Sequence, residues 1–243
     1  IRSKGKFIFE GDEKRIVDNI GPYLIPMRNI IVQKAPRPLN GLPRMDYGNK
    51  PSDGGYLILD RASKDALVKA YPEASQFIKA YVGSTEFISG VPRFCLWVED
   101  EKIEEARRVP DLNERFEKVR EVRTTSKGQQ ANANADRPHR FVFAPHRPGK
   151  ALIVPRVSSE RRPYLPVGIV DDATVISDRA AVIYNPEIWL LAIVASRMHL
   201  VWIATVCVRM RMDFSYSNTL GWHTFPMPTL TEKNKADLAR CAE

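Results

Sequence analysis

The spacing of apolar residues along the chain predicts short strands interleaved with helices. Apolar positions recur at three and four over residues 60–81 and again over residues 99–122, where Pro110 is expected to divide the helix in two. Apolar runs bounded by turn residues predict strands at 45–59 (around a Gly/Pro/Asp loop), 93–97, 152–157, 164–170 and 175–184. Together these elements predict an α+β fold with mixed or mostly antiparallel sheets.

The longest apolar stretch covers residues 190–208. Asn185, Pro186 and Glu187 precede it and form a helix start, with a polar cap, proline in the first turn and an acid near the positive end. We therefore predict a long buried helix over residues 186–206. A membrane span is the alternative, but Arg197 and His199 lie in its middle and are costly in hydrocarbon. We expect no membrane association.

The most regular pattern is the alternation of apolar and polar residues over 208–216. It predicts a half-buried strand. Its apolar face holds Val208, Met210, Met212, Phe214 and Tyr216. Its polar face holds Arg209, Arg211, Asp213 and Ser215.

On that strand Arg211 and Asp213 would stand side by side, about 7 Å apart. Arginine can donate two hydrogen bonds to guanine, and aspartate can accept one from cytosine N4. The pair is therefore suited to contact both bases of one G·C pair. A surface ion pair, worth about 0–1 kcal/mol, explains the same two residues without any ligand.

Positive charge is concentrated in the middle of the chain. The 243 residues carry 37 basic and 29 acidic side chains, a net charge of +8. Residues 115–162 alone hold twelve basic and four acidic residues, an excess equal to that of the whole chain. This favours a nucleic-acid surface, although a solvated basic face without a partner has the same composition. Within this stretch, residues 124–148 have few large apolar groups and are expected to form a mobile basic loop.

Other features of the sequence narrow the class of protein. A hydrophobic content of 44% and a charged content of 27% exclude a wholly disordered chain, a collagen and a disulfide mini-protein. The three scattered cysteines, Cys95, Cys207 and Cys241, favour a reducing compartment and predict no metal site. The chain opens with Ile1 and has no secretory signal pattern, so we interpret it as a fragment or a processed product.

Sequence motifs for catalysis are missing from the chain. It has no glycine-rich dinucleotide or phosphate loop, no Gly-x-Ser-x-Gly elbow and no His-Glu-x-x-His. The Asn/Asp-Pro-Pro-Tyr/Phe motif, with which adenine methyltransferases hold a flipped base, is also missing. Asp100 and Lys102 form the Asp-x-Lys pattern of nucleases, but such a match is common in a charged helix. We therefore predict no catalytic residue in this chain.

Five segments resemble, in the same order, the target-recognition region of MmeI-like enzymes, which are single-chain DNA adenine methyltransferases of restriction-modification systems. The resemblance runs from about Asn19 to Pro228. The segments are residues 48–55, 93–97, 155–162, 196–199 and 214–217. The family implies an upstream domain that binds S-adenosylmethionine and methylates adenine N6, so the cofactor belongs to the parent enzyme and none is expected here. By this resemblance, residues 1–20 are a connector from that domain, 21–228 the recognition domain and 229–243 the start of a helical C-terminal segment.

The resemblance also implies roles for individual residues. Family members contact bases from the strand after the long helix, where Arg211 and Asp213 look like the Lys/Asp variant of a variable pair. The next base-contacting position is Ser215, with a partner near Arg179, and this pair is also consistent with guanine. Positions implied for the DNA backbone are Lys50, Arg156, Arg161, Arg162 and Arg209. One departure is Gly221–Pro226, where the family often has Tyr-Asn-Asn-Phe-Pro.

The function expected from the sequence is recognition of a specific duplex DNA sequence for a methyltransferase domain in the same parent chain. A basic concave face would contact the DNA, and the protein would be cytoplasmic, or nucleoid-associated when bound. An alternative is a non-catalytic basic module that binds RNA or an acidic protein. A third hypothesis, a free-standing nuclease, rests only on the Asp-x-Lys pattern.

Overall fold

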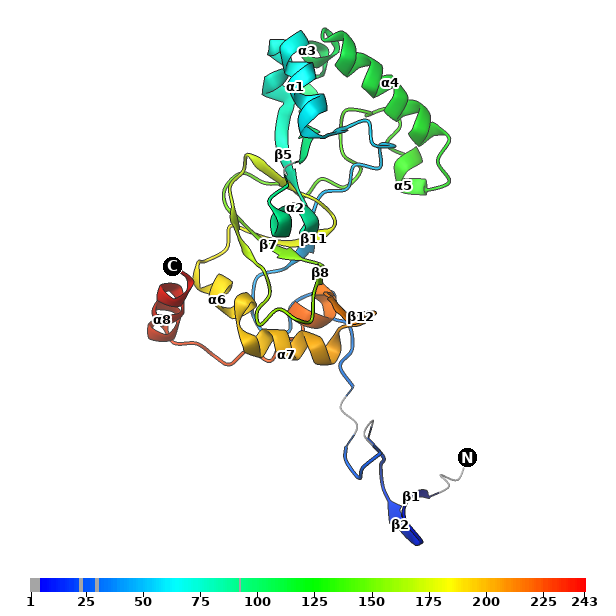
Figure 1. Ribbon diagram of the computed structural model, residues 1–243, viewed down its shortest axis with the longest axis vertical. Helices are drawn as coiled ribbons and strands as arrows, with labels where there is room; N and C mark the ends of the chain where they lie inside the picture. Colours follow the sequence, from blue (N-terminus) through cyan, green and yellow to red (C-terminus); the bar gives the residue numbers. More distant parts are fainter. Residues whose placement is uncertain (1–4, 22–23, 29–30, 92) are drawn as a thin grey trace. The chain divides into compact units, whose positions relative to one another are not determined.

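The computed structural model describes residues 5–21, 24–28, 31–91 and 93–243 (Figure 1). The chain divides into two compact units, Ile1–Gln33 and Lys34–Glu243. In the first unit, strands β1 (Lys6–Glu10) and β2 (Glu13–Val17) pair as an antiparallel hairpin. Gly11 supplies the positive φ of 60° at its tight turn.

The second unit combines helices with three sheets. Its helical elements are α1 (Arg61–Ala70), η1 (Pro72–Phe77), α2 (Ser84–Ser89), η2 (Asp100–Lys102), α3 (Ile103–Arg107), α4 (Pro110–Thr124), α5 (Gln129–Asn132), α6 (Trp189–Ala195), α7 (Arg197–Val206), η3 (Asn218–Trp222) and α8 (Glu232–Ala242). Its strands are β3 (Asp46–Tyr47), β4 (Ile58–Leu59), β5 (Ile78–Val82), β6 (Arg93–Leu96), β7 (Ala151–Pro155), β8 (Val157–Ser158), β9 (Gly168–Val170), β10 (Thr174–Ile176), β11 (Ala180–Tyr184), β12 (Arg209–Met210) and β13 (Asp213–Ser215).

Three sheets organise this unit, in the strand orders β10-β5-β6-β4, β3-β11-β7-β9 and β12-β13-β8. Among these paired strands only β10 and β5 run parallel, and the others are antiparallel. The expected α+β class with mostly antiparallel sheets is therefore confirmed.

The cores lie against these sheets. Helices α1, α3 and α4 lie around strand β5 (Figure 1), and this part of the protein has a core that includes Phe77 and Phe116. A second core joins β7 and β11 to α6, α7 and the segment around Trp222. Strand β7 contributes Leu152 to this core and Ile153 to a smaller one on its opposite face, so β7 is buried on both faces.

Two proline positions decide where helices begin and end. Pro110 is the first residue of α4, so the predicted break between helices is confirmed. The helix expected over residues 60–81 instead stops at Ala70, because the residue before Pro72 is disfavoured in the α region. Residues 78–82 then form strand β5 in the middle of a sheet.

The long helix predicted over residues 186–206 is wrong in one respect, because the structure has two helices there. They are α6 and α7, bent by 52°. Ser196 separates them with an extended ψ of 149°, and its hydroxyl accepts a hydrogen bond from the backbone N–H of His199 (3.1 Å). A serine cap thus interrupts the helix that the apolar run would otherwise allow. The first turn also begins later than expected, since Asn185 has a positive φ of 49° and does not cap α6.

Within the described residues, no single helix is long and apolar enough to cross a membrane. Helices α6 and α7 reach the length and apolar content of a membrane span only when they are counted as one segment, and the chain bends between them. Leu190, Val194 and Ile203 are all buried in the same core of the protein.

The strand predicted over residues 208–216 is also wrong, because the structure has a tight hairpin. Strands β12 and β13 pair antiparallel, with Arg209 opposite Phe214 and Met210 opposite Asp213. Arg211 and Met212 form the two-residue turn, and Arg211 has a positive φ of 58°. Residues paired across a hairpin share a face, so Met210 lies on the face of Asp213 and Arg209 on the face of Phe214. Of the predicted apolar face only Phe214 and Tyr216 are buried, while Val208, Met210 and Met212 are exposed.

Candidate nucleic-acid interface

The backbone of residues 151–158 passes from one sheet to the next. Strand β7 pairs with β11 up to Ala180 opposite Pro155. Strand β8 then pairs with β13, where Ser215 lies opposite Val157. Arg156 is the single residue between the two pairings. The turn before β11 and the hairpin therefore flank the same stretch of chain.

This crossing brings together two residues that are distant in sequence. If the β7–β11 register is continued by one position, Arg179 falls opposite Arg156. Ser215 lies opposite the next residue, Val157. Arg179 and Ser215 therefore lie opposite adjacent residues of the same stretch of chain, and their partnership stays a prediction. We call residues 156–162, 177–179 and 208–216 together the hairpin surface.

The hairpin places Arg211 and Asp213 differently from the predicted strand. Arg211 is exposed in the turn, while Asp213 is half-buried at the start of β13. Arg211 therefore lies in the tip of the hairpin and Asp213 directly after it, so the two residues do not share the face of one strand. A left-handed backbone at a non-glycine residue costs about 1–2 kcal/mol, and such strain is frequent at functional sites.

Buried aromatic residues anchor the hairpin. Phe214 and Tyr216 are buried, and the Tyr216 hydroxyl lies 3.0 Å from Nε2 of His199 on α7. Complete burial lowers the pKa of His199 to about 3, so its imidazole is neutral at physiological pH. The guanidinium of Arg209 lies over the Phe214 ring and donates to Glu160 (3.1 Å). The hairpin is therefore anchored by the contact of Tyr216 with α7 and by the ion pair of Arg209 with Glu160, which follows β8.

Exposed positive side chains lie next to the hairpin. Arg161 and Arg162 follow β8, and no described carboxylate lies within 4.0 Å of either one. The backbone beside Lys50 approaches the turn before β11, because the carbonyl of Asn49 accepts the backbone N–H of Asp178 (3.0 Å). Gly48 permits this approach, since a Cβ there would lie 2.3 Å from the Ser177 carbonyl oxygen. The Lys50 residue itself lines a pocket with Val122 of α4 and Gln129 of α5.

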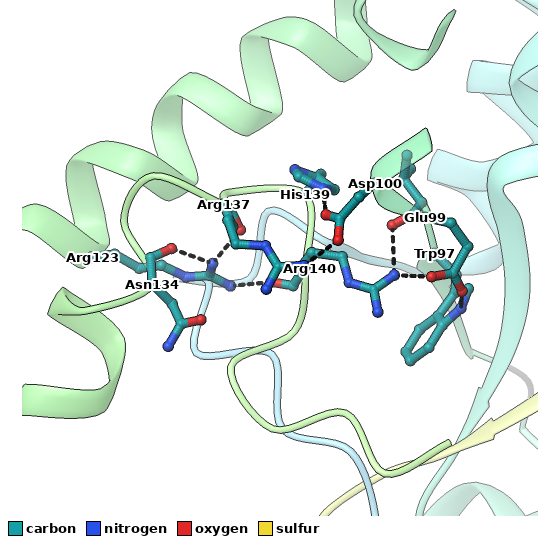
Figure 2. A network of polar contacts seen from close by, with 9 residues as sticks. Trp97, Glu99, Asp100, Arg123, Asn134, Arg137, His139 and Arg140 are labelled. Carbon is teal, nitrogen blue, oxygen red and sulfur yellow. Dashed lines mark hydrogen bonds and ion pairs between the residues drawn. The ribbon is translucent and has the colours of Figure 1, made fainter. Parts of the chain in front are cut away.

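Five of the twelve basic residues in 115–162 form ion pairs with carboxylates of the same chain. Figure 2 shows Arg137 paired with Asp100 and Arg140 paired with Glu99. On α4 itself, Arg115, Lys118 and Arg120 each pair with a carboxylate of the same helix. Part of the positive charge of this stretch is therefore balanced by ion pairs, and the basic face expected from the composition stays a prediction. The described cations of this stretch without a carboxylate within 4.0 Å are Arg123, Lys127, Arg147, Lys150, Arg156, Arg161 and Arg162.

Arg123 is the most unusual of these cations, because it is fully buried without a carboxylate partner. Its guanidinium has five N–H donors, and each meets a backbone carbonyl oxygen at 2.7–3.0 Å. The carbonyls belong to Pro51, Ser52, Asn134, Arg137 and Arg140. We call this arrangement the Arg123 carbonyl cage, part of which is visible in Figure 2.

The carbonyl cage explains two sequence segments. Residues 124–148, expected to be a mobile loop, are fastened to α4 at three carbonyls and contain the short helix α5. The Gly/Pro/Asp loop supplies the other two carbonyls. It is shaped by positive φ values at Gly54 and Gly55 and by the Asp53 carboxylate, which accepts the Leu57 N–H (2.6 Å). Sequence reasoning missed Arg123 because backbone carbonyls leave no signature in the sequence.

The residues of two motifs from the sequence, the metal-ligand types and the Asp-x-Lys pair, can be located in the structure. No group of three or more His, Cys, Asp or Glu side chains among the described residues is placed to hold a metal ion. Asp100 is bound to His139 and Arg137, whereas Lys102 donates to Gln76 (3.2 Å). The two residues of the Asp-x-Lys pattern thus have separate structural partners, which gives the nuclease hypothesis no support.

Comparisons with known proteins agree on one relationship. The family model described as "MmeI, target recognition domain" matches residues 26–229. DNA methyltransferase A of Bacillus subtilis (strain 168) is 36% identical over 233 residues, which is 96% of this chain and 26% of that protein. The solved structure of the type IIL restriction-modification enzyme MmeI in complex with DNA superposes with a TM-score of 0.87 and 30% identity, covering 99% of this chain and 33% of that one. The chain therefore spans about a quarter to a third of the length of these relatives.

Proposed function

The chain belongs to the MmeI target-recognition domain family, and from this premise we propose that it recognises a specific base sequence in duplex DNA through the hairpin surface. The observation that carries this proposal is the meeting of Arg179, Ser215 and the Arg211 hairpin around residues 156–158. A two-stranded β-ribbon fits the major groove of B-DNA, where each base pair presents a distinct pattern of donors and acceptors.

Arg211 and Asp213 form the first base-contacting pair. Arg211, in the exposed turn, is suited to donate to O6 and N7 of guanine. Asp213, at the first position of β13, is suited to accept from N4 of cytosine. We assign this pair to one G·C base pair, approached by the tip of the hairpin. The surface ion pair considered from the sequence is not formed, since no carboxylate of the described residues lies within 4.0 Å of Arg211.

Arg179 and Ser215 form the second pair. Arg179 is exposed at the end of the turn before β11, and Ser215 is half-buried on β13. The long arginine can reach a guanine across the short serine. We assign this pair to a second base pair, also with guanine.

Contacts to the phosphate backbone would position the domain without specifying sequence. Arg161 and Arg162 are exposed cations beside the hairpin surface and suit this role. Lys50 is a further exposed cation, next to α4 and α5, that we assign to the same role. Arg209 is a further candidate, although it shares its guanidinium with Glu160. We propose that these side chains line the basic concave face expected from the sequence.

The parent protein is proposed to be an S-adenosylmethionine-dependent DNA adenine-N6 methyltransferase of a restriction-modification system. The relatives named above are a DNA methyltransferase and a restriction-modification enzyme bound to DNA. This chain has no glycine-rich cofactor loop, so S-adenosylmethionine would bind in an upstream methyltransferase domain of the parent. The target adenine would be flipped into that domain. Residues 1–20 as connector, 21–228 as recognition domain and 229–243 as the start of a C-terminal segment remain our proposed boundaries, and the location would be the cytoplasm or nucleoid.

The test is selection of bound duplexes from a random-sequence pool by the full-length gene product, followed by sequencing. Binding should weaken steeply between about 50 and 200 mM salt, because phosphate contacts release counterions. Arg211→Ala should cost about 1–3 kcal/mol at one base pair and leave preferences elsewhere unchanged. The matched control is Arg240→Ala, an exposed arginine on α8 that pairs with Asp237.

Two outcomes would contradict the proposal. If the bound duplexes share no preferred sequence, the protein does not recognise bases. If it binds RNA more strongly than duplex DNA, the alternative of a basic module is favoured. An unchanged preference in Arg211→Ala would remove Arg211 from the base-contacting set.

A further inference from the structure

Arg156 occupies the point where the chain leaves one sheet and enters the next, so its N–H bonds to a side chain while its carbonyl continues the register of β8 with β13. Its N–H donates to the hydroxyl of Ser84 (3.0 Å), and its carbonyl accepts the N–H of Tyr216 (2.7 Å). Its guanidinium donates to the carbonyl of Asp178 (3.1 Å) and lies 4.4 Å from the centroid of the Tyr47 ring. One residue therefore touches helix α2, the turn before β11 and the chain that follows β13.

Ser84 completes this connection from the other side. It is the first residue of α2, which packs beside β7 (Figure 1). Its single hydroxyl accepts the Arg156 N–H and donates to the carbonyl oxygen of Arg179 (2.5 Å). Glu86 fixes the start of α2 by accepting the N–H of Gly83 (2.8 Å). The backbone of Arg179 is thus hydrogen-bonded, through one hydroxyl, to the backbone of Arg156.

The side chains of Arg156 and Arg179 have very different surroundings. They fall opposite each other when the β7–β11 register is continued, so two like charges would meet there. Arg156 avoids this by turning onto the Asp178 carbonyl and the Tyr47 ring. Arg179 keeps an exposed side chain.

We propose that Arg156 and Ser84 are positioning residues that hold Arg179 one register position from Ser215 and thereby set the base preference of that pair. This inference rests on the proposed function and adds two residues to it. It also changes the role of Arg156, which the sequence placed among the contacts to the DNA backbone.

The two roles of Arg156 predict different measurements. A phosphate contact, when removed, weakens binding to all sequences alike and lowers the salt dependence by about one counterion. A positioning residue, when removed, alters the preference at one base pair and leaves the salt dependence unchanged. The positional profile of the selected pool therefore separates the two roles.

The experiment compares Ser84→Ala, Ser84→Thr and Arg156→Met with Arg179→Ala in the full-length gene product, using random-duplex selection and sequencing. Discrimination at a contacted base pair is worth roughly 5- to 150-fold. We expect Arg179→Ala to abolish it at one base pair, and Ser84→Ala and Arg156→Met to lower it at the same base pair by about fivefold or more. Ser84→Thr keeps the hydroxyl and should retain the wild-type profile.

The matched control is Ser89→Ala in the same helix, whose hydroxyl bonds only to the Thr85 carbonyl of α2 among the described residues. It should match the wild type at every base pair. Equal loss at all base pairs in Ser84→Ala and Arg156→Met, or no change at the Arg179 position, would overturn the positioning role. A wild-type pool without any preferred sequence would instead overturn the proposed function, and this inference with it.

Discussion

Replacing Arg123 by methionine removes the guanidinium at the centre of the carbonyl cage while keeping a side chain of similar length. The five carbonyl oxygens of the cage then lose their donors, and they lie on two segments of the chain, residues 51–52 and 134–140. Because Arg123 is fully buried, water cannot replace the guanidinium without opening the structure.

The size of the effect follows from two opposing contributions. A hydrogen bond to a charged donor contributes about 1.5–3 kcal/mol, so the five bonds contribute on the order of 10 kcal/mol in gross terms. Burial of the charge costs several kcal/mol, and it also lowers the pKa of Arg123. We expect Arg123→Met to lower the free energy of unfolding by about 3–5 kcal/mol, the range found when a buried charged interaction loses one partner.

The assay is urea unfolding of the full-length gene product, with hydrogen exchange of residues 51–52 and 134–140 as a local readout. Arg123→Lys should fall between the wild type and Arg123→Met, because an ammonium group has three donors for five carbonyls. The control is Arg120→Met on the same helix, whose ion pair with Glu117 is partly exposed and worth about 0–1 kcal/mol. Equal unfolding midpoints for Arg123→Met and Arg120→Met would refute the reasoning.

Two further predictions concern His199 and Gly48, which lie next to the hairpin surface. The pKa of His199 is about 3 in the folded protein and about 6.5 when unfolded, so the unfolded chain binds more protons between these values. The stability contributed by neutral His199 is complete above pH 6.5 and is lost at about 1.4 kcal/mol per pH unit as the pH falls toward 3. His199→Gln should remove this pH dependence of the free energy of unfolding, measured by urea titration at several pH values. An identical pH dependence in the variant would contradict the assignment. Gly48→Ala places a methyl group against the Ser177 carbonyl and should cost about 1–3 kcal/mol in urea unfolding, whereas Gly128→Ala, where the nearest atom is 3.4 Å away, should cost less; equal costs would show that the approach of residue 48 to residue 177 is not tight.

Part of the candidate site could be predicted from local sequence alone. The alternation over residues 208–216 singled out Arg209, Arg211, Asp213 and Ser215, but the hairpin separates Arg209 from Asp213, because their cross-strand partners are Phe214 and Met210 respectively. The resemblance to a known family added Arg179 from a distant segment. The roles of all five residues at DNA stay predictions until the selections described above are made.

Other parts required the tertiary structure because their partners are backbone atoms. Ser84 bonds to an N–H and a carbonyl from two other segments, and Arg123 bonds to five carbonyls. Every residue except proline carries both of these backbone groups, so their positions cannot be inferred from residue types. The pairing of Arg137 with Asp100 and of Arg140 with Glu99 likewise depends on which loops meet in space, so the composition of the basic stretch did not reveal it.

The sequence by itself determined the α+β class, the antiparallel character of the sheets and the helix break at Pro110, since these follow from local periodicity and from the geometry of proline. Only the tertiary structure decided that residues 208–216 fold back as a hairpin and that α6 and α7 bend at Ser196. The hairpin leaves Val208, Met210 and Met212 exposed, whereas the predicted strand would have buried them, so local periodicity did not decide the conformation there. The choice is made by contacts from elsewhere, such as β8 against β13 and His199 against Tyr216.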